Sequence, residues 1–290
     1  MAYENAAQFD RALKCAIREA GGDPGSLYRQ ALRDRFLCRV FKGGEDDLVL
    51  KGGSGALARI AGARETRDVD FGYVGSEDAD AVVRDLVSRV SLDLGDFCRF
   101  ELTRREETMD DNGYSRLVKL RFATYVGAEE KDPVLIDLSL DCAPTGVPTR
   151  MEPASRVVLD GVETSPYLLY PLEDQLADKL CAIMERQPGG HESSRMKDLV
   201  DVVGYARTQE VSAALLSLAI RSECARRKMD IPTAFAAPGF WESGFGRFAS
   251  SLGLETGFEE ASAIASGLFD HVLAGETTGK WDCTRLSWVF

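Results

Sequence analysis

Residues 48–71 read LVLKGGSGALARIAGARETRDVDF, and this run carries most of the information about fold and function. It opens with a short apolar strand, Leu48–Leu50, which leads directly into Lys51-Gly52-Gly53-Ser54. A helix is expected from about Gly55 to Ala63, and a second strand from Asp68 to Val74. A strand, a glycine turn, a helix and an acidic strand, in this order, predict a site for phosphate groups and metal ions.

The acidic strand supplies two carboxylates at positions that suit a metal site. Asp68 and Asp70 are separated by one residue, so on a strand their side chains point to the same face. There they can hold two divalent cations for in-line phosphoryl transfer. Magnesium, or manganese in its place, suits such sparse carboxylate ligation, which water and substrate phosphates complete. The sequence therefore predicts Asp68 and Asp70 as metal ligands.

The glycine turn predicts the nucleotide side of the same site. Glycines let backbone N–H groups approach a triphosphate closely, and a hydroxyl near a helix N-terminus adds a hydrogen-bond donor. The turn contains neither the GxxxxGK[ST] pattern of a P-loop nor the GxGxxG pattern of a dinucleotide fold. The candidate nucleotide-binding residues are Lys51, Gly52, Gly53 and Ser54.

A third carboxylate is expected from a neighbouring strand. Asp137 lies in the apolar run Val134–Leu138 with an apolar neighbour on each side, as Asp70 has. Asp141 falls on the same face of an extended strand and is the alternative. For either residue, the plain structural interpretation is a solvent-exposed acid at a strand end. Asp137 is the first candidate to complete the metal site and to help to deprotonate an acceptor hydroxyl.

The rest of the chain indicates an α+β protein in two parts. A mixed β-sheet with flanking helices is expected over residues 1–165, and a helical C-terminal domain over residues 166–290. Further strands are expected at 98–104, 116–126 and 134–140, with a last short strand at 157–162. Helices are expected from Pro24 to the Gly43-Gly44 stop and at 78–92, 172–186, 195–207, 209–228 and 257–274.

Composition excludes several classes of protein. Of the 290 residues, 44% are hydrophobic and 28% charged, as is ordinary for a globular protein. No apolar run approaches the roughly 20 residues of a membrane span, and the polar N-terminus lacks a signal-peptide core. The seven cysteines are scattered without a CxxC pair, which indicates reduced thiols and a cytoplasmic protein. No membrane partner is expected.

Charge is unevenly distributed along the chain. The net charge of −12 argues against tight nonspecific binding to nucleic acid, which depends on neutralising phosphates. Between Arg11 and Lys42, however, eight basic residues face three acids. This basic segment is either a local surface for RNA or a solvated pair of helices. Its basic residues are Arg11, Lys14, Arg18, Arg29, Arg33, Arg35, Arg39 and Lys42.

Lys179 stands out in the helix expected at 172–186. Apolar residues at helical spacing form one stripe there, and Lys179 lies inside it. A lysine on a buried face is costly without an anionic partner, and a bound triphosphate is one such partner. A lysine that snorkels past the core edge, or that pairs with Asp198, is the structural alternative. The stripe consists of Leu172, Leu176, Leu180 and Ile183.

Residues 48–71 resemble the nucleotide-binding motif of the AbiEii/AbiGii toxin family, which includes the mycobacterial MenT toxins. Downstream, the family pattern K-L-x-A followed by R-x-x-D-L-x-D is similar to Lys179–Ala182 and Arg195–Asp201. The resemblance covers roughly residues 27–205. Family members commonly have a serine shortly before the acidic pair. This chain has Thr66-Arg67 there, so a role for such a serine does not transfer.

This resemblance implies the nucleotidyltransferase fold of the DNA polymerase beta-like superfamily. It also implies an enzyme that moves a nucleoside monophosphate from an NTP substrate to an acceptor. In the family, the lysine at Lys179 serves the nucleotide, and an acid at Asp198 is needed for activity. Arg195, three residues before Asp198, is then expected on a phosphate or orienting Asp198, with a structural salt bridge as the alternative. The expected catalytic set is Asp68, Asp70, Asp137, Lys179 and Asp198.

The acceptor and the partner are implied by the resemblance alone. Characterised relatives add nucleotides to the 3′ end of tRNA and so block translation, and each is a toxin paired with an antitoxin encoded beside it. The residues leave other functions open: transfer to a small-molecule or protein hydroxyl, or a nucleotide-binding regulator that has lost catalysis. Intact Asp68 and Asp70 speak against the regulator.

Overall fold

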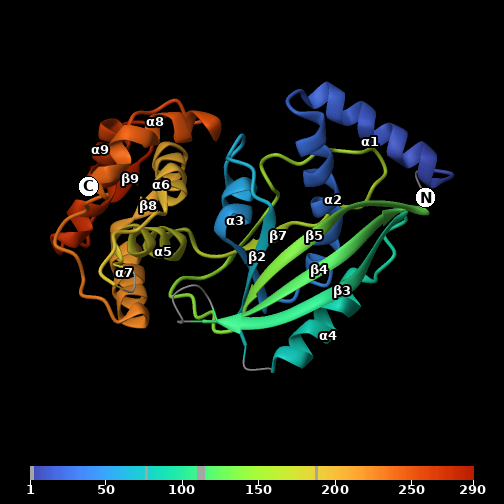
Figure 1. The fold of residues 1–290 in the computed structure, drawn as a ribbon, viewed down its shortest axis with the longest axis horizontal. Coiled ribbons are helices and arrows are strands. Elements are labelled where there is room, and N and C mark those ends of the chain that lie inside the picture. Colours follow the sequence, from blue (N-terminus) through green and yellow to red (C-terminus); the bar gives the residue numbers. More distant parts are fainter. Residues whose placement is uncertain (1–2, 76–77, 110–114, 187–188) are drawn as a thin grey trace. The chain divides into compact units, whose positions relative to one another are not determined.

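A computed structural model describes residues 3–75, 78–109, 115–186 and 189–290. The chain forms two compact units, coloured along the sequence in Figure 1. Unit 1 comprises Met1–Arg59, Glu65–Cys142 and Thr149–Leu169, and unit 2 comprises Ile60–Arg64, Ala143–Pro148 and Tyr170–Phe290. Within the described ranges, every helix is too short or too polar to cross a lipid bilayer.

Unit 1 is built on a seven-stranded mixed sheet with the strand order β3-β4-β5-β2-β1-β7-β6. The antiparallel strands β3, β4 and β5 run side by side as long arrows in Figure 1. Strand β2 pairs parallel with β5 and antiparallel with β1. This confirms the expected α+β class. The strands are β1 Leu48–Lys51, β2 Asp68–Tyr73, β3 Cys98–Met109, β4 Arg116–Val126, β5 Glu129–Ser139, β6 Thr149–Met151 and β7 Tyr167–Leu169.

The helices of unit 1 are α1 Ala6–Ala20, α2 Pro24–Phe41, α3 Gly52–Arg59 and α4 Ala79–Val90. Helix α2 begins as the sequence predicts, because the Asp23 carboxylate accepts a hydrogen bond from the Ser26 N–H at 2.6 Å. Its buried side packs on the sheet, where the Phe36 ring lies 5.2 Å from that of Phe100 and 5.1 Å from that of Phe122. These aromatic contacts fix α2 over strands β3 and β4.

A buried ionic network in unit 1 corrects the interpretation of the basic segment. Arg35 and Arg39, on α2, are only 3% and 1% exposed, so they form neither an RNA surface nor a solvated helix face. Both guanidiniums donate to the fully buried Asp96, with N–O distances of 2.6 Å. Burial raises the pKa of Asp96, but the two guanidiniums outweigh this effect and hold that pKa below its ordinary value. Two of the eight charges of this segment, those of Arg35 and Arg39, therefore serve the core. Four others are exposed, those of Arg11, Lys14, Arg18 and Lys42.

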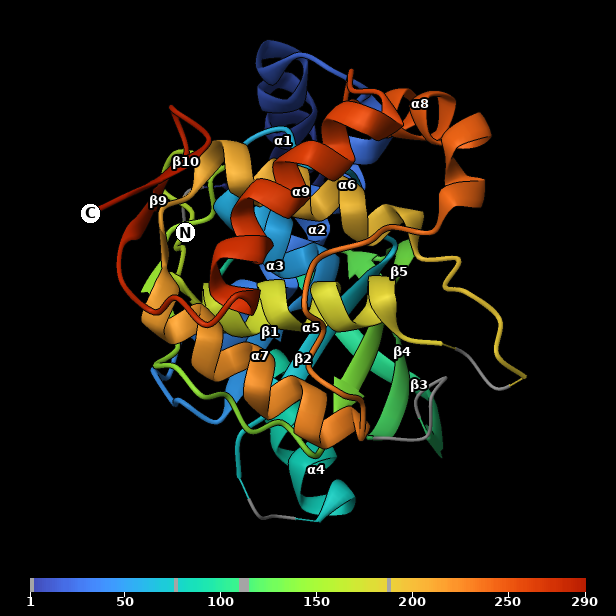
Figure 2. The same cartoon turned by 90° about the vertical axis from the view of Figure 1, so that its left-hand side faces the viewer.

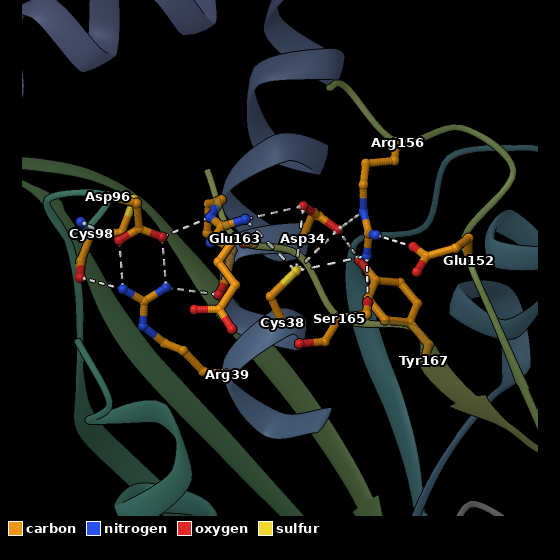
Figure 3. Close-up of polar contacts among 11 residues, drawn as sticks. Asp34, Cys38, Arg39, Asp96, Cys98, Glu152, Arg156, Glu163, Ser165 and Tyr167 are labelled. Carbon is orange, nitrogen blue, oxygen red and sulfur yellow. Dashed lines mark hydrogen bonds and ion pairs between the residues drawn. The ribbon is translucent and has the colours of Figure 1, made fainter. Parts of the chain in front are cut away.

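Figure 3 shows the same network from within, with Arg39 on Asp96 and Arg156 on Asp34. Arg156 Nε donates to Asp34 at 2.8 Å, and the Tyr167 hydroxyl also donates to Asp34. Asp34 thus joins α2 to strand β7 and to the loop before it. Removing one partner of such a network is costly because it leaves a buried charge uncompensated.

Several predicted boundaries of unit 1 are wrong. Helix α3 begins at Gly52 rather than Gly55, and β5 begins at Glu129. No strand forms at 157–162, where Val158 is 71% exposed. The strands in this region are instead β6 and β7, and all three residues of β7 are buried. Burial on both faces, which local alternation cannot show, selects the strand here.

Unit 2 is mainly helical, as expected, and Figure 2 shows its helices α5, α6, α7 and α9. The apolar stripe around Lys179 is buried on α5 as predicted, with Leu176 and Leu180 both 0% exposed. A three-stranded sheet of β8, β9 and β10 was not predicted. The elements are α5 Leu172–Met184, α6 Met196–Thr208, β8 Val211–Ser212, α7 Ala213–Arg227, η1 Gly239–Trp241, α8 Glu242–Ser251, α9 Phe258–Leu273, β9 Lys280–Asp282 and β10 Ser287–Val289.

Candidate active site

The turn between β1 and α3 lies directly against the second acid of strand β2. Gly52 has φ +60°, a left-handed conformation that favours glycine. A Cβ added at Gly52 would lie 2.6 Å from the carboxyl carbon of Asp70, which is too close for any side chain. A side chain at this position would therefore displace the Asp70 carboxylate, which the backbone of the turn meets with no side chain between them.

Strand register brings the expected carboxylates to one face of the sheet in unit 1. Asp70 on β2 lies directly opposite Asp137 on the parallel strand β5, and Lys51 on β1 lies opposite Asp70. Residues directly opposite each other on paired strands point to the same face. Asp68, two residues before Asp70, points to this face as well. The half-buried side chains of Asp68, Asp70 and Asp137 thus share one face of the two central strands β2 and β5.

Asp141, the alternative third carboxylate, lies in a different setting. Strand β5 ends at Ser139, so Asp141 has no register partner on β2. Its carboxylate accepts from the backbone N–H of Arg116 at 3.0 Å and lies 3.2 Å from the guanidinium of that residue. Asp137 is therefore the acid that the structure places beside Asp70.

The carboxylate face fits a hard divalent cation in its chemistry. Carboxylate oxygens are the ligands that magnesium prefers, and nucleotide phosphates and water complete its coordination. Across the described ranges, however, no group of three or more His, Cys, Asp or Glu side chains is already gathered closely enough to hold a metal ion. Asp70 and Asp137 are preorganised side by side, and substrate phosphates would supply the remaining oxygens.

Ser54 supports the backbone of the acidic strand. Its buried hydroxyl donates to the main-chain oxygen of Asp68 at 3.0 Å, and the Thr66 hydroxyl approaches the same oxygen at 3.3 Å. Ser54 thus ties the first turn of α3 to the start of β2. Gly53 beside it is buried, and both residues lie on α3.

Lys179 in unit 2 has two carboxylate partners. Lys179 is only 2% exposed, and its ammonium donates to Asp198 at 3.0 Å and to Asp201 at 2.6 Å. Arg64, in the segment of unit 2 that precedes Asp68 in the sequence, donates to both carboxylate oxygens of Asp201, at 2.7 and 2.9 Å. The structure thus shows the pairing of Lys179 with Asp198 that the sequence left as an alternative.

The protonation states of this cluster follow from its charges. Burial lowers the pKa of Lys179, but Asp201 and Asp198 outweigh it and raise that pKa above the ordinary value. Burial raises the pKa of Asp201, but Lys179 and Arg64 outweigh it and lower that pKa. The ammonium and the Asp201 carboxylate are therefore both charged at neutral pH.

Arg195 lies at the start of helix α6, and its side chain is 37% exposed. Its Nε lies 3.7 Å from Asp198, so the i, i+3 pair expected from the sequence is present, although it is too long for a hydrogen bond. The backbone N–H of Arg195 donates to the Ser193 hydroxyl at 3.2 Å. Arg195 thus has a partly solvated guanidinium beside one of the two partners of Lys179.

Asp201 and Arg64 were given no role by the sequence. Asp198 and Asp201 are three residues apart on α6 and both are buried, at 7% and 5% exposure. Two acids on one buried helical face require cations nearby. This spacing could have predicted Asp201 as a second partner of Lys179. Arg64 gives no such signal, because its pairing with Asp201 spans 137 positions of the chain.

Comparison with known proteins gives a family and a similar fold. The model of a family described as nucleotidyl transferase AbiEii toxin, type IV TA system, matches residues 35–265. MenT4, a nucleotidyltransferase toxin from Mycobacterium tuberculosis, is similar with a TM-score of 0.51 and 16% identity, over 95% of this chain and 100% of that one. JHP933 from Helicobacter pylori has a TM-score of 0.46 and 16% identity, over 88% of this chain and 94% of that one. No curated protein matches the chain.

The likeness to MenT4 shows a shared fold, and the family match adds the activity. That match spans well over half of the chain and includes the glycine turn, the acidic strand and the Lys179 cluster. The family is one of toxins that have cognate antitoxins and use NTP substrates. The chain belongs to the AbiEii family of nucleotidyl transferase toxins of type IV toxin–antitoxin systems, and it is a nucleotidyltransferase.

Proposed function

We propose that this enzyme transfers a nucleoside monophosphate from an NTP to the 3′-hydroxyl of tRNA in the cytoplasm, with magnesium as its metal. The observation that carries the proposal is the register of Asp70 opposite Asp137, with Asp68 on the same face. Three carboxylates on one face of neighbouring strands suit the transfer of a phosphoryl group between oxygens. They also argue against a regulator that has lost catalysis.

The residues of unit 1 take distinct parts in this reaction. Asp68, Asp70 and Asp137 would hold the metal, which neutralises phosphate charge and favours the ionised form of the attacking hydroxyl. The glycine turn at Gly52 and Gly53 offers its backbone to the triphosphate, with Lys51 on the same face as Asp70. Asp137 would accept the proton of the acceptor hydroxyl as that oxygen attacks the α-phosphate and pyrophosphate leaves.

The residues of unit 2 are proposed to serve the nucleotide. Lys179 carries a positive charge, and the family resemblance gives this position to the phosphates. Asp198 and Arg195 are proposed to position it. Asp201 accepts hydrogen bonds from both Lys179 and Arg64. If Asp198 turns away from Lys179 to another partner, Asp201 therefore still neutralises the lysine. The RNA acceptor is taken from the family resemblance, in which characterised relatives modify the 3′ end of tRNA.

A labelling experiment tests this function. The purified enzyme is incubated with total tRNA and with each of the four NTPs labelled at the α-phosphate, in magnesium, in manganese or in excess EDTA. We expect label on tRNA with at least one NTP in either metal and none in EDTA. The matched control is tRNA oxidised by periodate, which has lost its 3′-terminal diol and should take no label.

Two results would contradict the proposal at different levels. Label on a protein or on a small hydroxyl compound, with none on tRNA, would replace the acceptor and keep the transferase. Label on periodate-treated tRNA would show transfer to a position other than the 3′ end. Loss of labelling when a neighbouring gene product is added would identify the cognate antitoxin.

A further inference from the structure

The open face of the sheet in unit 1 carries a row of charged residues that extends from the carboxylates toward strand β3. Lys119 on β4 lies directly opposite Asp137, and Glu106 on β3 lies directly opposite Lys119. The row therefore places a basic residue one strand away from the proposed metal ligands. In order from β3 to β1 it consists of Glu106, Lys119, Asp137, Asp70 and Lys51.

A second row on the same face is more strongly basic. Arg121 on β4 lies opposite Leu135 on β5, which lies opposite Asp68 on β2. On its other side Arg121 lies directly opposite Arg104 on β3. Three exposed basic side chains form what we call the β3–β4 basic surface. They are Lys119, Arg121 and Arg104.

A β-bulge in β3 determines which arginine reaches this surface. The register of β3 shifts between Leu102 and Arg104, so Thr103 is the extra residue, and its hydroxyl donates to the Arg121 carbonyl at 3.0 Å. The shift turns Arg104 to the open face and Arg105 to the face covered by α4. There Arg105 forms an ion pair with Asp80 at 2.5 Å. The bulge thus determines which of the two neighbouring arginines lies on the open face.

Fold stability does not explain this arrangement. Like charges directly opposite each other on paired strands are destabilising, and Arg104 faces Arg121 in this way. Arg104 has one acidic partner, Glu106, at 2.9 Å. For Lys119 and Arg121, the described part of the chain contains no ion pair. Arg121 lies opposite Arg104 and Leu135, with no acid directly across from it on either strand. This local excess of positive charge on a protein of net charge −12 favours an anionic ligand.

We propose that the β3–β4 basic surface binds the phosphodiester backbone of the acceptor RNA and leads its 3′ end to Asp68, Asp70 and Asp137. The inference rests on the proposed transfer to RNA. Neighbouring strands are about 5 Å apart, so the surface begins about 5 Å from Asp137 at Lys119 and reaches about 10 Å at Arg104. A polynucleotide whose terminal hydroxyl is at the carboxylates can place upstream phosphates over this distance. Contacts of this kind position a strand without reading its bases.

The test compares two pairs of substitutions that remove the same charge. Lys119→Gln/Arg121→Gln removes two charges from the surface, and Arg11→Gln/Arg18→Gln removes two exposed charges from α1, in the basic segment. Binding of total tRNA, labelled with fluorescein at its 5′ ends, is measured by anisotropy at several salt concentrations without NTP. Calorimetry measures affinity for the NTP that labels best, and thermal melting measures stability.

For the surface pair we expect roughly tenfold weaker tRNA binding and a salt slope reduced by about two, because each lost phosphate contact lowers that slope by nearly one. NTP affinity should not change, and Tm should hold or rise because a repulsive cross-strand pair is relieved. The α1 pair should bind tRNA as the wild type does. Lys119→Arg keeps the positive charge, and tRNA binding by this variant at the wild-type level would further support a contact with phosphate.

Several results would overturn the proposal or the RNA acceptor on which it rests. Unchanged tRNA binding in the surface pair would exclude this path for RNA, and loss in the α1 pair instead would move the path to the basic segment. A loss of NTP affinity as large as the loss of tRNA binding would assign the surface to the triphosphate. If the wild type binds and labels no RNA but labels a protein, the RNA acceptor itself fails. If it labels tRNA and the surface pair labels equally well, only the surface assignment fails.

Discussion

The α-carbon of Gly52 faces the carboxylate of Asp70 so closely that a Cβ at position 52 would come within 2.6 Å of the carboxyl carbon. This contact joins the two halves of the sequence motif, the glycine turn and the acidic strand, in one local structure. It also makes the turn sensitive to the smallest possible substitution.

Gly52→Ala should abolish nucleotide transfer and lower the free energy of unfolding by about 1–2 kcal/mol, since φ +60° is strained for alanine and Asp70 has to move. Gly62→Ala is the matched control. Gly62 also has positive φ, +75°, but open space lies around its α-carbon. It should lose a similar amount of stability and keep its activity. Equal loss of activity in both variants would show that strain, and not the contact with Asp70, is responsible.

Asp70→Asn and Asp137→Asn should each abolish transfer while leaving Tm unchanged or slightly higher. The two carboxylates lie side by side across β2 and β5, so neutralising one relieves their repulsion. Asp141→Asn should retain most of the activity, because that residue lies beyond the end of β5. Transfer assays and thermal melts check all three. Activity lost in Asp141→Asn but retained in Asp137→Asn would reverse the assignment.

Lys179→Met should lower the free energy of unfolding by about 3–5 kcal/mol, because it leaves the buried Asp198 and Asp201 without their shared cation. Chemical denaturation measures this change. Lys14→Met is the control, since it breaks the exposed pair of Lys14 with Asp10 and should cost less than about 1 kcal/mol. A stable Lys179→Met variant that has lost only NTP affinity would show that its two carboxylates tolerate the loss of the ammonium.

The stability of the wild type should fall as the pH drops below about 4, partly through Asp201. The folded pKa of Asp201 is lowered, so its contribution is present above the unfolded pKa and is lost as the pH falls through the folded value. Asp201→Asn should be less stable at neutral pH and should show a shallower decline in acid. Denaturation curves between pH 2 and 7 measure this, with the exposed Asp132→Asn as control. Parallel declines in Asp201→Asn and the wild type would exclude the role of Asp201.

Much of the fold follows from local sequence signals. Strand β4 has the boundaries that its alternation predicts, and the stripe on α5 is buried as its helical spacing requires. The third carboxylate is different, because alternation places Asp137 and Asp141 on the same face. Only the end of β5 at Ser139 and its pairing with β2 distinguish them. Pairing partners distant in sequence are outside the reach of a local pattern.

The charged residues show the same limit more strongly. A count of basic residues between Arg11 and Lys42 contains no information about Asp96, which is 57 positions from Arg39 and neutralises it in the core. The partners of Lys179 lie 19 and 22 positions away. Whether an arginine or lysine serves the core, a ligand or solvent depends on such partners, and composition alone does not identify them.

The bulge at Thr103 has a consequence for how this surface could change during evolution. If the strand paired without a bulge and kept Thr103, simple alternation would place Thr103 opposite Arg121, carry Arg105 to the open face and turn Arg104 toward α4. The two arginines would exchange faces, and Arg105 would replace Glu106 opposite Lys119. Relatives with the same residues on β3 can therefore display different charge patterns according to whether the bulge forms, and a gapless alignment would hide the difference.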